Sequence, residues 1–143
     1  MLYLGCPQWS STAWKGNLLS SHCKSADMLN EYAHTFNSVE GNTSFYADPS
    51  HESLLRWCDA VPNDFKFTFK FHRRFSHELQ LTNINNELNA WLTLFEPIFA
   101  KTGQIMLQLP SAFGPNALPL LTNFIAQLPK HLNYGVEVRH PAF

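Results

Sequence analysis

Short apolar runs alternate with longer amphipathic segments along the whole chain, and this alternation limits the folds open to it more than any other feature. The clearest run is Phe65–Phe71, in which phenylalanine at every second position alternates with lysine or threonine, as in a strand with one buried face. Four further runs predict strands at Leu2–Gly5, Ser38–Asn42, Ile105–Leu109 and Tyr134–Val138. Strands that alternate with helices favour βαβ units and a parallel sheet.

Four amphipathic segments lie between these strands. Apolar residues recur at helical spacing in Asp27–Phe36, between Asp48 and Pro62, from about Asn85 to Ala100, and between Leu118 and Leu128. Asp48-Pro49 is typical of an N-cap followed by a proline at the first helical position, and Pro97 predicts a kink in the third helix. This pattern fits either an open doubly wound sheet or part of a (β/α)₈ barrel, which needs about 250 residues.

The composition bounds the classes of protein to which the chain can belong. Its 143 residues suffice for one domain, and a hydrophobic content of 45% excludes an intrinsically disordered chain. A net charge of −1 argues against wholesale binding to nucleic acid or acidic membranes. The three cysteines lack C-x-x-C spacing, and no apolar stretch is long enough for a signal peptide or a membrane span. We therefore expect a cytoplasmic protein without a membrane partner.

Motifs at the expected strand ends favour the barrel. They occur in the order Gly5-Cys-Pro-Gln-Trp-Ser10, Val39-Glu-Gly-Asn-Thr-Ser-Phe-Tyr46, Phe67-Thr-Phe-Lys70 with Ser76-His77-Glu78, Leu107-Gln-Leu-Pro-Ser111 and Val136-Glu-Val-Arg-His-Pro141. Together they resemble the YecE-like family, domain of unknown function 72. Many members have Gly-Trp where this chain has Pro7-Gln8-Trp9, and Glu-Ile-Asn where it has Glu40-Gly41-Asn42.

This resemblance implies an α/β fold of the (β/α) TIM-barrel type. Because members of that family are longer than this chain, it further implies a single YecE-like domain over residues 1–143, truncated at the C-terminus. We accordingly expect an incomplete barrel of about five parallel strands and four helices. The resemblance implies no reaction, substrate or cofactor, so the function has to be sought in the residues themselves.

Two carboxylates are the first candidates for a functional site. Glu40 and Glu137 each lie in a short apolar strand, where an unpaired carboxylate would be costly. The strand period of two places Asn42 beside Glu40, and Arg139 beside Glu137, on one face. If that face lines a barrel, the four groups converge near the strand ends and could bind a polyol, position a water or hold a metal. The alternative is a buried Glu–Arg pair that only fixes strand register.

Three further side chains follow the third and fourth strands. Lys70 is a candidate partner for an anion or a carboxylate, although it could equally be solvated at the strand end. His77 could serve as a general acid, a general base or a ligand. Gln108 is polar within an apolar strand and needs hydrogen bonds if it is buried, from a ligand or from Asn42 or Lys70.

Two aromatic residues and a histidine complete the candidates at the strand ends. Trp9 and Tyr46 both follow strands and could stack on a sugar or a base, with core packing the more economical interpretation for Trp9. His140 could face the pocket or lie at its rim without a role. No nucleotide-binding or helical metal-binding motif is present, so no metal site is predicted and the cofactor is unknown.

Three hypotheses for the function follow. The first is an enzyme-type barrel scaffold that binds a small anionic or sugar-like ligand. Its catalytic candidates are Glu40, Lys70, His77 and Glu137, and its ligand-binding candidates are Asn42, Tyr46, Gln108, Arg139 and His140. The second, less favoured, is a nucleic-acid or phosphodiester binder that uses the basic residues Lys66, Lys70, Arg73 and Arg74. The third is an inactive truncated fragment, which would self-associate through its open sheet edges.

Overall fold

One sheet of five parallel strands organises the molecule. The computed structural model describes residues 1–143, and its strands are β1 (Gly5–Cys6), β2 (Ser38–Gly41), β3 (Lys66–Lys70), β4 (Thr102–Gln108) and β5 (Tyr134–Glu137). Each strand pairs with its neighbours in sequence, so the order in the sheet is β1-β2-β3-β4-β5. The predicted α/β fold with five parallel strands is confirmed, and the sheet is open rather than closed into a barrel.

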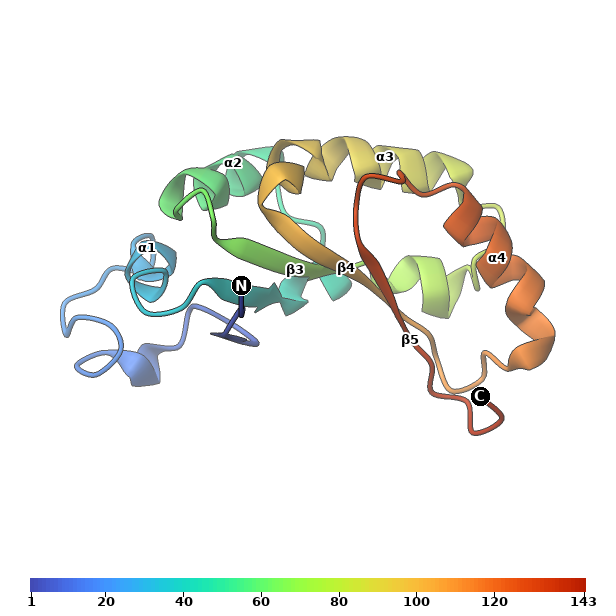
Figure 1. Ribbon diagram of the computed structural model, residues 1–143, viewed down its shortest axis with the longest axis horizontal. Coiled ribbons are helices and arrows are strands. Elements are labelled where there is room, and N and C mark those ends of the chain that lie inside the picture. The colour runs from blue at the N-terminus through green and yellow to red at the C-terminus, as the bar shows by residue number, and fades with distance from the viewer.

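The helices connect successive strands. They are α1 (Met28–Tyr32), α2 (His51–Ala60), α3 (Asn85–Phe95) and α4 (Leu118–Ala126). Shorter turns are η1 (Thr12–Trp14), η2 (Asn42–Phe45), η4 (Glu96–Lys101) and η5 (Pro115–Ala117), together with a π-helical turn η3 (Arg74–Glu78). Figure 1 shows α2 and α3 lying along one face of the sheet, with α4 near β5. None of the helices has the length and apolar character that crossing a membrane requires.

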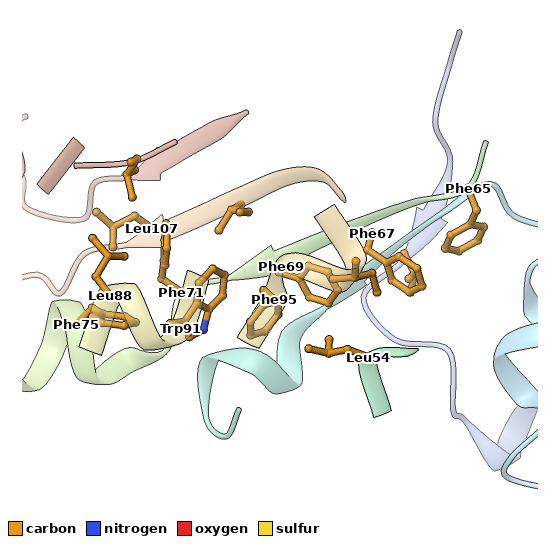
Figure 2. Close-up of a cluster of buried hydrophobic side chains, with 14 of the residues drawn as sticks. Leu54, Phe65, Phe67, Phe69, Phe71, Phe75, Leu88, Trp91, Phe95 and Leu107 are labelled. Atoms are coloured by element: carbon orange, nitrogen blue, oxygen red, sulfur yellow. The ribbon is translucent and has the colours of Figure 1, made fainter. Parts of the chain in front are cut away.

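The two faces of the sheet differ in chemistry, as the alternation in Phe65–Phe71 predicts. Phe67 and Phe69 point toward the helices, are fully buried and stack on each other with ring centroids 5.6 Å apart. Phe69 also meets Phe95 of α3 edge-on at 5.2 Å, within the aromatic core seen in Figure 2. Burying one such ring contributes about 2 kcal/mol. The other face carries Thr68 and Lys70, which are half-buried.

The first strand is shorter than predicted and is displaced along the chain. Leu2–Gly5 was predicted as a strand, but only Gly5–Cys6 pairs with β2. The side chain of Asn37 takes the place of backbone hydrogen bonds between strands here. It accepts from the Leu4 amide at 2.8 Å and donates to the Leu2 carbonyl at 2.9 Å. The backbone before Gly5 is therefore held without strand geometry.

A tyrosine hydroxyl joins the first two strands. Tyr32 Oη accepts a hydrogen bond from the Cys6 amide at 2.7 Å and donates one to the Ser38 carbonyl at 2.9 Å. The strands approach so closely here that a Cβ on Gly5 would lie 1.9 Å from the Ser38 carbonyl oxygen. Only glycine fits at this position.

Helix boundaries also differ from the prediction. Asp48-Pro49 is not the start of α2, because Ser50 is the N-cap and its hydroxyl accepts from the Ser53 amide at 3.1 Å. The third helix, predicted to Ala100, ends at Phe95 and continues as η4, where Pro97 occupies the first turn. The first helix, predicted over Asp27–Phe36, has only five residues, and β4 begins at Thr102 rather than Ile105.

Candidate functional site

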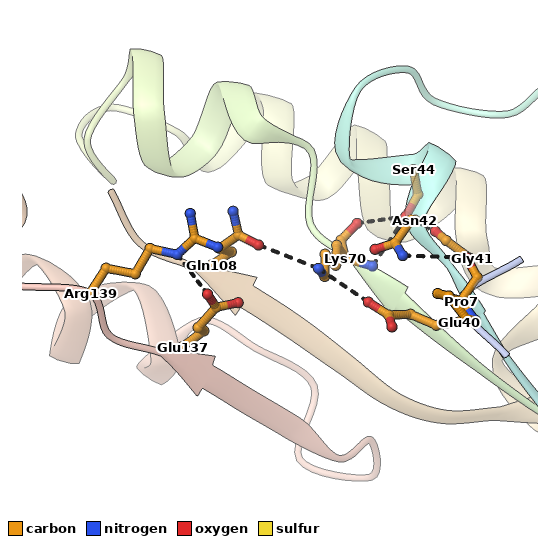
Figure 3. Close-up of polar contacts among 9 residues, drawn as sticks. All are labelled: Pro7, Glu40, Gly41, Asn42, Ser44, Lys70, Gln108, Glu137 and Arg139. Carbon is orange, nitrogen blue, oxygen red and sulfur yellow. Dashed lines mark hydrogen bonds and ion pairs between the residues drawn. The ribbon is translucent and has the colours of Figure 1, made fainter. Parts of the chain in front are cut away.

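A lysine links three neighbouring strands at their carboxyl ends. Lys70 Nζ lies 3.1 Å from Glu40 Oε1 on β2 and 3.3 Å from Gln108 Oε1 on β4 (Figure 3). The Lys70 side chain is 18% exposed and Gln108 is 8% exposed, whereas the Glu40 side chain is 36% exposed, so water reaches the ion pair from the Glu40 side. Ligand sites of parallel α/β proteins lie at this end of the sheet.

The register of the strands explains why these side chains meet. Glu40 pairs with Thr68, two residues before Lys70 on β3, and Lys70 pairs with Met106, two residues before Gln108 on β4. The period of two places all of them on the face opposite the aromatic core. The long lysine side chain then reaches both neighbouring strands diagonally.

A buried serine fixes the backbone at Lys70. Ser44 of η2 is 1% exposed, and its hydroxyl accepts from the Lys70 amide at 3.1 Å. The same hydroxyl lies 2.8 Å from the Lys70 carbonyl and 3.0 Å from the Gly41 carbonyl, so its single proton is donated to one of them. Ser44 is not among the predicted site residues. Its position in the motif directly after a predicted strand is the signal that could have found it.

A second ion pair flanks the first on the same face of the sheet. Arg139 Nε and Glu137 Oε1 are 2.6 Å apart, and both side chains are partly exposed. Glu137 pairs in register with Gln108, which places it beside the Lys70 contacts in Figure 3. Arg139 lies two residues beyond the end of β5, and its side chain meets that of Glu137. The strand ends therefore present two carboxylates, two cations and an amide in one row.

His77 lies at the same rim. It sits in η3, its Nδ1 is 2.9 Å from the Ser76 hydroxyl, and its ring packs edge-on against Phe45 with centroids 5.4 Å apart. Desolvation lowers the pKa of His77, and the positive charges of Arg73 and Arg139 lower it further.

Three other predicted site residues are engaged elsewhere. Asn42 donates from Nδ2 to the Pro7 carbonyl at 3.4 Å and not to Gln108, for which it was a candidate partner. Tyr46 is exposed, with its ring edge-on to Phe45 at 5.0 Å. His140 accepts from the Ala142 amide through Nδ1 at 3.1 Å and lies close over Gly114.

The four basic residues of the third strand and its loop do not form one surface. Lys66 Nζ donates to the Ala100 carbonyl at 2.9 Å, at the other end of β3 from Lys70. Arg73 lies 3.8 Å from Glu78, and Arg74 lies 3.7 Å from Glu87. Each cation thus has its own partner.

Trp9, a candidate for stacking on a ligand, packs among other aromatic side chains instead. Trp9 packs edge-on against Trp57, with centroids 5.0 Å apart, and also contacts Phe67, which agrees with the core interpretation. The three cysteines are free, and Cys23 is buried. No group of three or more His, Cys, Asp or Glu side chains comes together in a way that could hold a metal ion.

Comparison with known proteins identifies close relatives. The family model described as "Protein of unknown function DUF72" matches residues 3–143. The chain is 45% identical over 143 residues to the UPF0759 protein YecE of Escherichia coli strain K12, and equally to that of Escherichia coli O157:H7. In both cases the match covers all of this chain and 50% of the relative, so the chain spans about half the length of these relatives.

Solved structures of two DUF72 family proteins have a similar fold. The protein from Enterococcus faecalis V583 superimposes with a TM-score of 0.81 at 25% identity, covering 99% of this chain and 52% of that one. The protein from Thermotoga maritima MSB8 gives a TM-score of 0.82 at 25% identity, covering 99% of this chain and 57% of that one.

Proposed function

The chain belongs to the DUF72 family of proteins of unknown function, and we propose that it binds a small polyhydroxylated or anionic ligand at its strand ends through Glu40, Lys70 and Gln108. The contacts of Lys70 with Glu40 and Gln108 carry this proposal. A half-buried lysine joined to side chains of two neighbouring strands is a preorganised group of donors and acceptors, as ligand sites require.

A polyhydroxylated ligand suits this arrangement better than a simple anion. Lys70 and Arg139 are already paired with carboxylates, so an anion would compete with Glu40 and Glu137 for them. A hydroxyl both donates and accepts, and so can bind a carboxylate and an ammonium group at once. Gln108 uses only its oxygen within the chain, which leaves its amide nitrogen to donate to the ligand.

The flanking residues extend the same site. Glu137 and Arg139 continue the row of alternating charges, and His77 adds an imidazole at the rim. Because the pKa of His77 is lowered, its ring is neutral near neutral pH. A neutral imidazole can accept a proton from a bound ligand. Glu40, Glu137 and His77 are the groups to which we would assign proton transfer if the bound ligand reacts.

The nucleic-acid hypothesis has less support. It needs a continuous basic surface, whereas Lys70, Arg73 and Arg74 are each paired with a different glutamate. Each of these cations would have to leave its glutamate to contact a phosphate, which reduces the net gain from binding a phosphate backbone.

Thermal denaturation with candidate ligands tests the proposal. The 143-residue chain would be melted with D-ribose, D-glucose, myo-inositol or inorganic phosphate, each at millimolar concentration. A ligand that binds only the folded state raises Tm in proportion to the logarithm of its concentration. We expect a rise with at least one sugar or polyol, smaller with phosphate, and lost in both Lys70→Met and Gln108→Leu.

Lys130→Met is the matched control, since Lys130 is exposed and lies outside the strand-end row. It should retain the full shift. Equal shifts of Tm in the parent chain and in all three variants would place the ligand elsewhere and contradict the proposal. The absence of a Tm shift with every compound would also contradict it. Comparable titrations with a single-stranded oligonucleotide would distinguish the nucleic-acid alternative.

A further inference from the structure

A second pocket lies on the polar face of the sheet, at the opposite end of the strands from the Lys70 contacts. It is a cavity of about 380 Å³ over the amino ends of β2, β3 and β4. Lys66, which lines it, comes four residues before Lys70 on β3, so the two places lie about 13 Å apart along the strand. The volume falls within the roughly 300 to 1,000 Å³ that is typical of small-molecule sites.

The floor of this pocket is a block of polar side chains from three strands. Ser38 on β2 pairs in register with Lys66 on β3. Thr68, two residues further along β3, pairs with Gln104 on β4. The register shifts at this point, with Gly103 as the extra residue of a bulge. A side chain at Gly103 would lie against Lys66, since its Cβ would come within 3.2 Å of the Lys66 Cβ, so the glycine leaves the floor uncovered there.

Three of the polar groups on this floor have no hydrogen bond within the chain and can be reached from solvent. They are the hydroxyls of Ser38 and Thr68 and the side-chain amide of Gln104. The two hydroxyls are open to water, and Gln104 is an exposed residue. Each of the three groups can donate as well as accept. Lys66 differs from them, because its ammonium group already donates to the Ala100 carbonyl at 2.9 Å.

A tyrosine borders the pocket beside β2. Tyr3 lines the cavity and is 44% exposed, and its ring packs against no other aromatic ring. The backbone on both sides of it is fixed by Asn37, which bonds the Leu2 carbonyl and the Leu4 amide. A tyrosine ring is apolar over its faces, so a ring held in this way can stack on the apolar face of a ligand.

We infer that this pocket binds a neutral sugar ring, whose C–H face stacks on Tyr3. The hydroxyls of the sugar exchange hydrogen bonds with Ser38, Thr68 and Gln104, since a hydroxyl both donates and accepts, as these groups do. No carboxylate lines the pocket to hold a cation, and the ammonium group of Lys66 is already engaged, which disfavours a simple anion. A wholly apolar molecule would leave the polar floor without partners.

Methyl β-D-glucopyranoside is the probe, and the side-chain amide signals in proton–nitrogen correlation spectra of the 143-residue chain are the readout. The pair of signals missing from Gln104→Leu identifies Gln104. We expect the glucoside at millimolar concentration to shift this pair, with an affinity that falls about fivefold in Tyr3→Ala through the loss of stacking. The Gln108 pair, identified in the same way from Gln108→Leu, reports on the Lys70 site separately, so each proposal can fail without the other.

Leu2→Ala is the matched control for Tyr3→Ala. Leu2 is an exposed neighbour that does not line the pocket, so this variant should bind the glucoside as the parent chain does. D-mannitol has the hydroxyls of a sugar but no ring face, and should bind more weakly. An unmoved Gln104 signal would overturn the inference, as would mannitol binding as tightly as the glucoside or an affinity unchanged in Tyr3→Ala. A larger shift with inorganic phosphate would indicate an anion site at Lys66 and would overturn it too.

Discussion

Ser44 ties the end of β3 to η2, and its loss should be costly although it is a single hydroxyl. Ser44→Ala leaves the Lys70 amide without its acceptor in a buried place. We expect the free energy of unfolding to fall by about 2 kcal/mol, as for other buried groups left unpaired. Urea denaturation measures it, with Ser25→Ala, at an exposed serine, as the control that should change nothing. A Ser44→Ala midpoint equal to that of the parent would contradict this role.

His77 should make the protein sensitive to mild acid. The pKa of His77 in the folded chain lies below the ordinary 6.5, chiefly through desolvation. At a pH between the lowered pKa and 6.5, the unfolded chain therefore binds a proton that the folded chain does not. The free energy of unfolding therefore falls as the pH falls through 6.5 toward the lowered value. In His77→Gln, the loss of Tm between about pH 7.5 and about pH 5.5 should be smaller than in the parent chain.

Thermal melts across this range test the effect, with His22→Gln as the control. His22 is exposed, and an exposed imidazole is hydrated in both states, so this variant should retain the parent's dependence on pH. If His77→Gln lost as much stability in acid as the parent chain, the sensitivity would have to lie in other groups.

The period of two predicts contacts between side chains of one strand, whereas the site depends on contacts between strands. Glu137 and Arg139 are two residues apart and do meet. Glu40 was grouped with Asn42 in the same way, yet Asn42 begins η2 and turns toward Pro7. The partner of Glu40 is Lys70, on another strand, and that pairing depends on register between strands, which a single sequence does not reveal.

At the scale of elements, a buried lysine caps the C-terminus of α2. It was not among the predicted functional or structural residues. Lys101 Nζ donates to the carbonyls of Cys58 and Val61, both at 2.7 Å. An ammonium group here satisfies the last carbonyls of the helix and opposes its dipole. Lys101→Met keeps the apolar stem but leaves both carbonyls unpaired, so we expect the free energy of unfolding to fall by about 3 kcal/mol.

Lys66→Met is the matched control for Lys101→Met. Lys66 also donates from Nζ to a carbonyl, that of Ala100 at 2.9 Å, but it does so near the surface, where water can replace it. Its loss should cost less than about 1 kcal/mol. Equal losses in urea denaturation of the two variants would mean that burial does not decide the contribution of Lys101.

The existence of the elements could be predicted more reliably than their ends. All five strands and all four helices appear in the predicted order, because each is marked by several apolar residues at a regular period. Their boundaries depend on single side chains instead. Asn37 holds the chain before β1, and Ser50 rather than Asp48 caps α2. The Asn37 contact joins Leu4 across 33 positions, which local sequence does not show, and Ser50 and Asp48 are both residue types that cap helices, so the sequence does not choose between them.

At the scale of the whole molecule, the outer strands should limit stability. β1 and β5 each pair on one side only, and apolar Val136 and Val138 are exposed near the edge formed by β5. Unpaired edges invite association with other chains. We expect the 143-residue chain to have a lower urea midpoint than the same chain extended with the C-terminal half of the Escherichia coli relative, because further strands would cover β5.

Light scattering after size-exclusion chromatography should accompany that comparison. We expect the 143-residue chain to form dimers or larger species as its concentration rises, and the extended chain to remain monomeric. Equal midpoints and a monomeric short chain would show that the open edges carry no cost.

The order of the strands also has a consequence for biosynthesis. Every strand of this sheet pairs with the strand made immediately before it, and none inserts between two older ones. As the polypeptide leaves the ribosome, the sheet can grow by adding each new strand to an existing edge. The polar face would remain wetted throughout, while α2 and α3 cover the aromatic face soon after it is made (Figure 1). Nascent chains of increasing length should therefore gain protection from protease one βα unit at a time.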